Sequence, residues 1–449
     1  MSRFLICFCL LLCLLGAGYT TPDAPSGERS LKLEARIQEI MHRPEYRNAR
    51  WGMKFYSPDT KQVIYSINSD QLFQPASAVK VFVAATAFSA LGPDYRFHTP
   101  VYRTGPVIDG VLKGDLVLVA GGDLLLGGRV QPDGTLALPE PDHSYDMHPD
   151  AVPVPGDPLR SIREIAGQVA AHGIKRIEGR VLVDASLFRE AKGEAGGTGK
   201  FTVSPITIND NLVDVIVTPG SREGEPGTLR VSPETSYVKV INQTKTTAAS
   251  AAPTSGMPQM GPGALRFGDE VTNADGTQTV TLTGNISLGS RPALRAYRIP
   301  EPVRFAQSVL AEALREKGIS AEVDLLATPD YQTLSTFYTA KNRLAEHISP
   351  PLSEQVKVML KVSSNPPTFR ILSERLRERD KENAKKTGNE FQAKLIEKAG
   401  LNPADGNSES NFGEKYSAEF FIKFLTYMSQ QPTFPNTLPP CPSWGSTDR

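Results

Sequence analysis

Cysteine is scarce in this chain. The 449 residues include four cysteines, and Cys7, Cys9 and Cys13 all lie within residues 1–18. That segment starts with a basic residue, continues with a short apolar run and ends with small residues, a pattern typical of a secretory signal. Only Cys441 would remain after its removal, which excludes an intramolecular disulfide and a metal–thiolate site. We expect export to the periplasm or cell envelope with no stable membrane span after signal cleavage; a short membrane anchor is the alternative.

The sequence also has no net charge and no cluster of histidines. Lysine plus arginine equals aspartate plus glutamate at 49 each, so no global field favours nucleic acid or an anionic membrane. The sequence shows no glycine-rich phosphate loop and no stripe of basic and aromatic residues. Among the six histidines, His143 and His148 flank an acidic, proline-rich loop, which is poor geometry for metal ligands. We therefore expect no nucleic-acid partner, no metal and no cofactor.

The most informative stretch that is present covers residues 74–91. Pro75 suits the first turn of a helix, nearly every residue after Lys80 is apolar, and Gly92 followed by proline ends the run. Ser77 and Lys80 are three positions apart, so their side chains share one helix face. Burial lowers the pKa of a lysine and lets it act as a base toward a neighbouring hydroxyl. Ser77 is thus the candidate nucleophile and Lys80 its base, although such a lysine could also extend to the surface.

A second polar motif, Ser363-Ser364-Asn365, follows an amphipathic segment at 352–361. A Ser-x-Asn on a loop between helices offers a hydroxyl that can relay a proton to a leaving amine. It also offers an amide that can bind a substrate backbone. Serine and asparagine are equally ordinary helix-capping residues. Because this motif is paired with the first one across a long intervening region, Ser363 is a candidate catalytic residue and Asn365 a candidate substrate-binding residue.

Secondary-structure signals are helical at both ends of the chain and strand-like between them. Besides the stretch after Pro75, the segments expected to be helical are 31–43, 159–173, 302–317, 344–361 with an interruption near Pro350-Pro351, 369–386, 390–399 and 417–428. A strand hairpin at 52–66 precedes the first motif. Residues 101–290 show mostly short strands and loops, with a glycine-rich loop at 190–200. We expect one domain formed by 31–100 and 291–449, interrupted by an inserted β-rich domain at 101–290.

The matching pieces of a known family are spread along most of the chain. They are Pro75-Ala76-Ser77 with Lys80, residues 91–97, 114–118, Gly121-Gly122-Asp123, residues 211–220, His347-Ile348-Ser349-Pro350-Pro351-Leu352 and Ser363-Ser364-Asn365. On these residues the chain resembles the D-alanyl-D-alanine carboxypeptidase/endopeptidases, the class C low-molecular-mass penicillin-binding proteins. A large insertion separates the first two motifs in that family, as it does here. The resemblance implies an α/β (α+β) fold, a penicillin-binding-protein/β-lactamase-like transpeptidase domain interrupted by a β-rich insertion.

The resemblance also implies a reaction. The family members are serine-type D-Ala-D-Ala carboxypeptidases or endopeptidases that act on peptidoglycan peptides by acyl-enzyme chemistry. Ser77 would attack, Lys80 would act as base, Ser363 would relay the proton and Asn365 would orient the substrate; the base assignment is disputed in related enzymes. The backbone N–H of Ser77 would be one oxyanion donor. The implied partners are peptidoglycan stem peptides, with β-lactam antibiotics as acylating inhibitors.

The third motif of the family is a departure. It is a Lys-Thr-Gly on a strand, which holds the substrate carboxylate and completes the oxyanion hole. Lys386-Thr387-Gly388 spells it within helical sequence, and its end suggests a helix stop followed by a new N-cap, so we interpret it as a chance match. The true motif and further strands of the central sheet would be expected beyond residue 428, where the given sequence is proline-rich up to Arg449. The alternative function is therefore a catalytically impaired or truncated homologue that acts as a non-catalytic wall-binding or scaffold protein.

Overall fold

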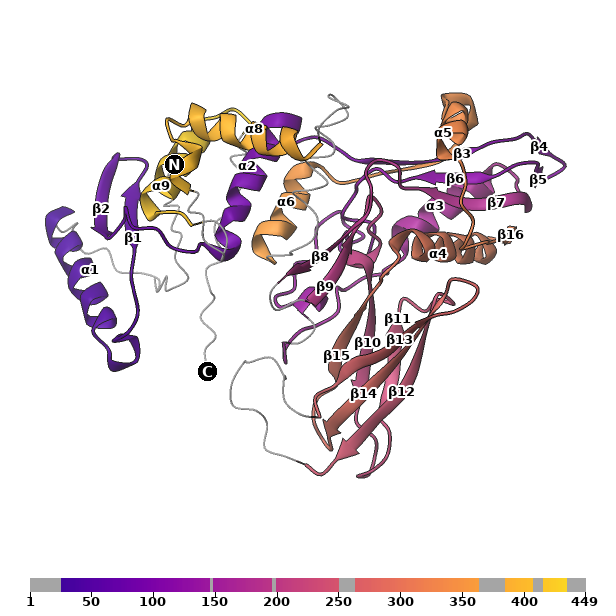
Figure 1. Ribbon diagram of the computed structural model, residues 1–449, viewed down its shortest axis with the longest axis horizontal. Helices are drawn as coiled ribbons and strands as arrows, with labels where there is room; N and C mark the ends of the chain where they lie inside the picture. The colour runs from indigo at the N-terminus through magenta and orange to yellow at the C-terminus, as the bar shows by residue number, and fades with distance from the viewer. Residues whose placement is uncertain are drawn as a thin grey trace. The chain divides into compact units, whose positions relative to one another are not determined.

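The computed structural model describes residues 26–145, 148–195, 199–249, 263–362, 384–406 and 415–433. The chain divides into two compact units, one formed by Met1–Pro93 with Asn389–Arg449 and one formed by Asp94–Gly388. Figure 1 shows the helices and strands of both units. The predicted secretory segment, Ser363 and Asn365 lie outside the described residues. The predicted domain limits, 31–100 with 291–449 and 101–290, come from secondary-structure signals along the sequence, and they stay a prediction.

The first unit combines a strand hairpin with helices from distant parts of the chain. β1 (Met53–Ser57) pairs antiparallel with β2 (Gln62–Ile67), which confirms the predicted hairpin. The helices are α1 (Ser26–Met41), α2 (Lys80–Leu91), most of α8 (Ala384–Lys398) and α9 (Ala418–Ser429), with short 3-10 turns η1 (Pro44–Tyr46), η2 (Ala76–Val79) and η7 (Pro403–Gly406). Gly92 ends α2 with φ 86°, a left-handed conformation that favours glycine. Ser417 caps α9 by accepting a hydrogen bond from Phe420 N, as the sequence predicted.

The second unit is built on a mixed seven-stranded sheet. Its strand order is β17-β3-β6-β7-β5-β4, with β16 paired to β7. The strands are β3 (His98–Arg103), β4 (Val107–Ile108), β5 (Val111–Leu112), β6 (Leu116–Val119), β7 (Arg176–Asp184), β16 (Ser320–Glu322) and β17 (Arg343–Ile348). β6 pairs in parallel with the second half of β7, and the apolar, buried residues there, Leu116–Leu118 and Val181–Val183, show the pattern of strands covered on both faces.

Helices cover this sheet and close its edge. α3 (Arg160–Ala171) and α4 (Pro302–Glu316) bury one stripe each against the sheet, in a core that includes Ile165, Val181 and Val309. The short α5 (Tyr331–Leu334) packs on Val117 and Leu182, which face the other way. β17 is an edge strand, and the Gln168 side chain on α3 bonds both the backbone N–H and the carbonyl of Glu346. That pair of bonds satisfies part of an edge that would otherwise be open to pairing.

Two three-stranded sheets extend from the same unit. One contains β10 (Leu212–Thr218) between β11 (Thr228–Ser232) and β15 (Ala293–Arg298). The other contains β14 (Gln278–Ser287) between β12 (Val238–Thr247) and β13 (Arg266–Thr272). Val215 and Val217 of the first sheet share a core with Leu282 and Ile286 of the second. All of these strands except β15 lie in the region 101–290 that was expected to be β-rich, and α6 (Leu352–Lys361) follows later in the chain.

Several sequence-based expectations were wrong in this unit. The glycine-rich segment at 190–200, expected to be a loop, contains β8 (Ala191–Ala195), which pairs with β9 (Gly199–Val203) as an antiparallel hairpin. The first part of the segment expected to be helical at 344–361 is strand β17. Its leucine, alanine and glutamate are good helix formers, but pairing with β3 and the bonds from Gln168 override that weak local preference.

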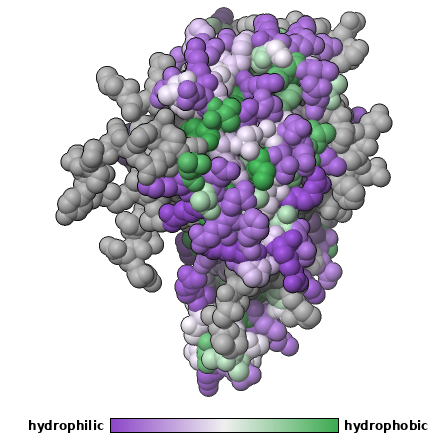
Figure 2. Space-filling view, turned by 90° about the vertical axis from the view of Figure 1, so that its left-hand side faces the viewer, coloured by the Kyte–Doolittle hydropathy of each residue, from purple (hydrophilic) through white to green (hydrophobic). Residues whose placement is uncertain are grey.

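The described residues show a mostly hydrophilic face and no membrane-crossing helix. Hydrophilic side chains predominate on the face in Figure 2, where hydrophobic residues form small separate groups. Among the helices that the structure describes, none combines the length and the apolar character needed to cross a bilayer.

Candidate active site

Ser77 and Lys80 meet at the start of α2. Ser77 lies in the 3-10 turn η2, and Lys80 is the first residue of the α-helix that continues from it. Lys80 Nζ lies 3.3 Å from Ser77 Oγ and donates a hydrogen bond to it. Ser77 is exposed, whereas the Lys80 side chain is partly buried. The spacing of three thus brings a nucleophile and a base together, with the hydroxyl accessible to a substrate.

The environment of Lys80 changes its acid–base behaviour. Burial disfavours the charged ammonium and lowers the pKa of Lys80 from 10.5 to about 8. A lysine with this pKa is partly unprotonated near neutral pH, so it can accept the proton of a neighbouring hydroxyl. The pair therefore has the geometry and the pKa direction that serine activation needs.

The residue before Ser77 carries backbone strain. Ala76 has φ 46°, in the left-handed region that residues with a Cβ rarely adopt. Such a conformation costs about 1–2 kcal/mol for an ordinary L-residue. Strained residues that persist in a fold gather at functional sites, so the outlier next to Ser77 supports its role as a candidate nucleophile.

An aromatic cluster fixes the helix that carries Lys80. Phe82 on α2 is buried, and its ring stacks on Phe421 with a centroid distance of 5.0 Å. Tyr416 and Phe424 also contact the Phe82 ring, at 5.0 and 4.8 Å. Leu395 and Ile396 from α8 complete the same core. This packing of α2 against α8 and α9 orders the turn that places Ser77 beside Lys80.

An ion pair adds to the same unit. Lys54 on β1 pairs with Glu419 in the first turn of α9. Burial would raise the pKa of Glu419, but Lys54 holds it below its ordinary value. The hairpin is thereby tied to the helix that packs on α2.

The second motif and the Lys-Thr-Gly triplet have different outcomes in the structure. Ser363 and Asn365 are not among the described residues; α6 ends at Lys361, two positions before Ser363 in the sequence. Lys386-Thr387-Gly388 was expected to lie between two helical segments, and it lies inside α8. The expected helix stop at its end is wrong, because α8 continues to Lys398. Within the described part of the chain, this triplet does not begin a strand.

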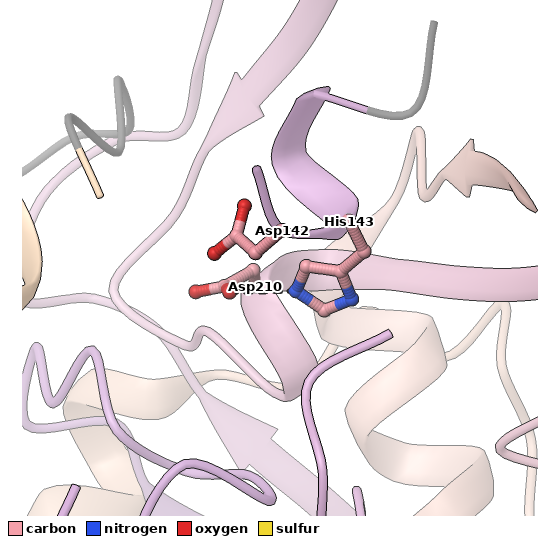
Figure 3. A group of neighbouring side chains, drawn as sticks. All are labelled: Asp142, His143 and Asp210. Carbon is pink, nitrogen blue, oxygen red and sulfur yellow. Dashed lines mark hydrogen bonds and ion pairs between the residues drawn. The ribbon is translucent and has the colours of Figure 1, made fainter. Parts of the chain in front are cut away.

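Sequence analysis missed a buried charge network in the second unit. His143, in a 3-10 turn η3 (His143–Tyr145), is fully buried. Its Nε2 lies 2.8 Å from Asp210 Oδ2, and its Nδ1 lies 3.0 Å from Asp214 Oδ1. Arg129 Nη2 donates to Asp142 Oδ2 and to Asp210 Oδ2, at 2.5 Å each. Figure 3 shows the ring of His143 close to the carboxylates of Asp142 and Asp210.

Charge pairing explains why these ionisable groups can be buried. Burial alone would lower the pKa of His143, but the carboxylates of Asp210 and Asp214 raise it to about 10. Burial would raise the pKa of Asp210, but Arg129 and His143 hold it well below its usual range. Asp210 lies in a turn of three successive residues with positive φ, 209–211, a conformation that asparagine and aspartate tolerate best. The network therefore holds a strained turn in place. Its residues are far apart in the sequence, so no local sequence pattern predicted it.

The same cluster was tested as a metal site. One ligand atom each from Asp142, His143 and Asp210 lie within 4.8 Å of one another. The guanidinium of Arg129, however, already bonds both carboxylates, and His143 with a pKa of about 10 is a second cation. A metal ion would need neutral histidine and would have to displace Arg129. The donor set does not fit a metal, and we interpret it as an ion network.

Comparison with known proteins extends these observations. The model of the D-Ala-D-Ala carboxypeptidase 3 (S13) family matches residues 33–406. The chain is 26% identical over 376 residues to a D-alanyl-D-alanine carboxypeptidase of Actinomadura sp. (strain R39), with 79% of this chain and 59% of that protein covered. It is 23% identical to a penicillin-sensitive carboxypeptidase A of Dictyostelium discoideum, with 70% and 56% covered. The D-alanyl-D-alanine carboxypeptidase DacB of Haemophilus influenzae is also 23% identical, with 68% and 54% covered.

The fold agrees with solved structures. Penicillin binding protein 4 (dacB) from Haemophilus influenzae matches with a TM-score of 0.57 and 18% identity, over 84% of this chain and 75% of that one. Its complex with a β-lactam matches with a TM-score of 0.52 and 19% identity, over 84% and 73%. These matches confirm the predicted penicillin-binding-protein fold with extra domains. The chain spans between 54% and 59% of the length of the curated relatives that it matches.

Proposed function

Because the chain belongs to the D-Ala-D-Ala carboxypeptidase 3 (S13) family, we propose that it is a serine-type carboxypeptidase of peptidoglycan peptides. The observation that carries the proposal is the 3.3 Å contact between Lys80 Nζ and Ser77 Oγ, inside the segment that the family model matches. The lowered pKa of Lys80 supports its assignment as the base. The substrate would be a stem peptide that ends in D-Ala-D-Ala.

The proposed reaction proceeds through an acyl-enzyme. Lys80 takes the proton of Ser77 Oγ, and Oγ attacks the carbonyl carbon of the penultimate D-alanine. The backbone N–H of Ser77 donates to the oxygen that becomes negative. When the tetrahedral intermediate collapses, the C–N bond breaks and the leaving D-alanine amine takes a proton through Ser363, while Asn365 orients the substrate. Water then hydrolyses the ester to the Ser77 hydroxyl and the shortened peptide.

Endopeptidase activity and acylation by β-lactams are two further proposals that use the same acyl-enzyme chemistry. If the amine that leaves belongs to a cross-linked peptide rather than to free D-alanine, the enzyme acts as an endopeptidase. A β-lactam carries a strained amide, so attack by Ser77 Oγ would open its ring and leave the drug attached as an ester. The proposed location is the periplasm or cell envelope, where peptidoglycan is accessible and where the sequence of residues 1–18 would direct the chain.

A non-catalytic role is the second candidate function. Lys386-Thr387-Gly388 lies in a helix, so in the described residues this triplet does not supply the strand donor that the family chemistry uses. A wall-binding or scaffold protein would bind peptidoglycan peptides without releasing D-alanine. Turnover therefore distinguishes the two functions.

The test combines labelling with turnover. A fluorescent penicillin should label the full chain, and Ser77→Ala should abolish the label because it removes the attacking oxygen. The matched control is Ser89→Ala, which removes an exposed hydroxyl from the same helix and should leave labelling unchanged. A D-alanine release assay on a synthetic peptide ending in D-Ala-D-Ala then separates enzyme from scaffold. Equal labelling of Ser77→Ala and wild type would refute the proposal, and binding of the peptide without release would favour the second function.

A further inference from the structure

Four buried side chains of the second unit converge without completing their hydrogen bonds. Asp123 Oδ2, Gln355 Oε1, His347 Nε2 and Thr99 Oγ1 are all buried and have no hydrogen-bond partner among the described residues. They come from four places: the segment after β6, α6, β17 and β3. Unsatisfied buried polar atoms are rare in native proteins, and each needs an explanation. We call these four residues the polar node.

Interatomic distances and strand register place the members of the node together. Asp123 Oδ2 lies 3.5 Å from His347 Nε2, and Gln355 Nε2 donates to Asp123 Oδ1 over 3.2 Å. The oxygen of the same Gln355 amide, Oε1, is bonded to the same carbon as Nε2, so it lies near the same carboxylate. Thr99 stands directly opposite His347 in the antiparallel pair of β3 and β17, so the two side chains leave the same face of the sheet.

The chemistry of the four atoms is complementary to one small ligand. Gln355 Oε1 accepts hydrogen bonds, and Asp123 Oδ2 does so as a carboxylate oxygen. The Thr99 hydroxyl can donate, and so can His347 Nε2 when it carries the ring proton. A water molecule offers two hydrogens and two lone pairs, which matches two acceptors and two donors. A separation of 3.5 Å between Asp123 and His347 is longer than a normal hydrogen bond, and water commonly bridges such contacts.

Further contacts surround Asp123 and His347, two members of the polar node. Asp123 Oδ1 accepts from Leu125 N at 2.9 Å as well as from Gln355, which fixes the carboxylate plane. His347 Nδ1 lies 3.9 Å from Glu164 Oε2 on α3. Asp123 and Glu164 are thus the charged groups that face His347 from the neighbouring elements.

We propose that Thr99, Asp123, His347 and Gln355 enclose an internal water molecule that joins α6 to β3 and β17. Gln355 is the member on α6, so the water and the direct bond to Asp123 together fix that helix on the sheet. Resting on the proposed function, this makes the four residues positioning residues, because α6 ends two positions before Ser363 in the sequence. They touch neither Ser77 nor Lys80 in the role proposed for them.

Crystallography of the full chain tests the ligand directly. The expected result is a density peak within about 2.7–3.2 Å of Asp123 Oδ2, Gln355 Oε1, His347 Nε2 and Thr99 Oγ1. The peak should persist in Thr99→Ser, which keeps the hydroxyl, and should disappear or move in Thr99→Val, which replaces the hydroxyl by a methyl group. Direct bonds among the four side chains with no peak would overturn the proposal, and so would an anomalous signal that identifies a metal ion.

A double-mutant cycle tests the shared ligand by a second route. Thr99→Val and Gln355→Leu should each raise the unfolding equilibrium constant by about fivefold or more, and Thr99→Ser should recover most of the Thr99 effect. Because both side chains bond the same water, the double variant should lose less than the product of the two effects. Thr99→Val combined with Thr235→Val is the control, since the Thr235 hydroxyl bonds Glu312 elsewhere in the unit. Multiplicative effects in the first pair would contradict a shared water.

The rate constant of acylation by penicillin tests the positioning role separately from the effect of a variant on stability. If wild type is labelled by penicillin, Gln355→Leu should lower the acylation rate constant at saturating penicillin at a temperature where the variant is fully folded, with Thr235→Val unchanged. An unchanged rate constant would overturn the positioning role. If wild type is not labelled at all, the proposed function fails, while the density peak and the cycle still decide whether the water exists.

Discussion

His143 Nε2 lies 2.8 Å from Asp210 Oδ2, a residue 67 positions away along the chain. Both groups are buried, and His143 also contacts Asp214 on its other nitrogen. The pair joins the η3 turn to the turn at 209–211, so it is a long-range contact that holds two segments of the second unit in place. The stability that this contact contributes depends on the charge of His143, because a buried carboxylate needs a cationic partner.

We predict that His143→Gln destabilises the second unit by about 3–5 kcal/mol at neutral pH, since it leaves Asp210 and Asp214 with less positive charge. The pKa of His143 is raised from 6.5 to about 10, so its stabilisation is fully present below pH 6.5 and is lost as the pH rises towards 10. Urea unfolding of wild type and variant at several pH values measures this. The difference between the two proteins should shrink with rising pH.

The control for this prediction is His172→Gln. His172 is an exposed histidine whose Nε2 bonds the backbone carbonyl of Leu344, not a carboxylate. Its substitution should cost less, about 1 kcal/mol for one lost hydrogen bond. A pH-independent difference for His143→Gln would show that its ring is neutral in the folded protein.

Lys80 gives a prediction on the pH dependence of acylation. A general base must be unprotonated, and the pKa of Lys80 is lowered by burial to about 8. The rate of acylation by penicillin should therefore rise with pH and level off above about 8. Lys80→Ala should reduce that rate by about a hundredfold to ten-thousandfold. Stopped-flow labelling measures both effects, with Lys341→Ala, an exposed lysine, as the control. A flat pH profile between 6 and 9 would argue against Lys80 as the base.

Local sequence was sufficient where the structure depends on near neighbours. The spacing of Ser77 and Lys80, the hairpin of β1 and β2, and the Ser417 cap all follow from contacts within a few residues. The edge strand β17 was mistaken for helix because its pairing with β3 comes from more than two hundred residues away. The same reason hid the ion network, in which Arg129 and Asp210 are 81 positions apart.

The polar node shows the limit of motif analysis. Asp123 and His347 belong to segments that were noted only as matches to a family, and Asp123 and Gln355 are 232 positions apart. The sequence contains no periodicity that would bring the two together. Dismissing His143 as a metal ligand from its spacing relied on local geometry alone, whereas the argument against a metal now rests on Arg129, which already bonds Asp142 and Asp210.

Export is a prediction about the first residues of the chain. A basic start, an apolar run and small residues at 16–18 should direct the protein through the secretory route, with cleavage shortly after residue 18. Mass spectrometry of protein from envelope fractions should find a terminus there. Recovery of the chain with an intact Met1 from the cytoplasm alone would contradict both the cleavage and the proposed location.

Phe82 is predicted to be critical for the first unit. Its ring contacts Tyr416, Phe421 and Phe424, so Phe82→Ala should leave a cavity and cost about 3–5 kcal/mol. Phe391→Ala is the control, because that ring is 42% exposed and its loss should change stability by no more than about 0.5 kcal/mol. Thermal unfolding of both variants measures this. If the two substitutions cost the same, the aromatic cluster does not hold α2.

Lys386 provides the last prediction, which concerns the chance match to a third motif. In the family chemistry the lysine of Lys-Thr-Gly holds the substrate carboxylate from a strand, but here the backbone of Lys386-Thr387-Gly388 belongs to α8. Lys386→Ala should therefore change acylation by penicillin by less than about twofold, whereas loss of one true oxyanion donor costs about a hundredfold to a thousandfold. Parallel labelling of Lys386→Ala, Lys80→Ala and wild type measures this, with circular dichroism to confirm that helix content is kept. A loss with Lys386→Ala as large as that with Lys80→Ala would mean that this lysine binds the substrate, and that α8 is not helical at the triplet when substrate is bound.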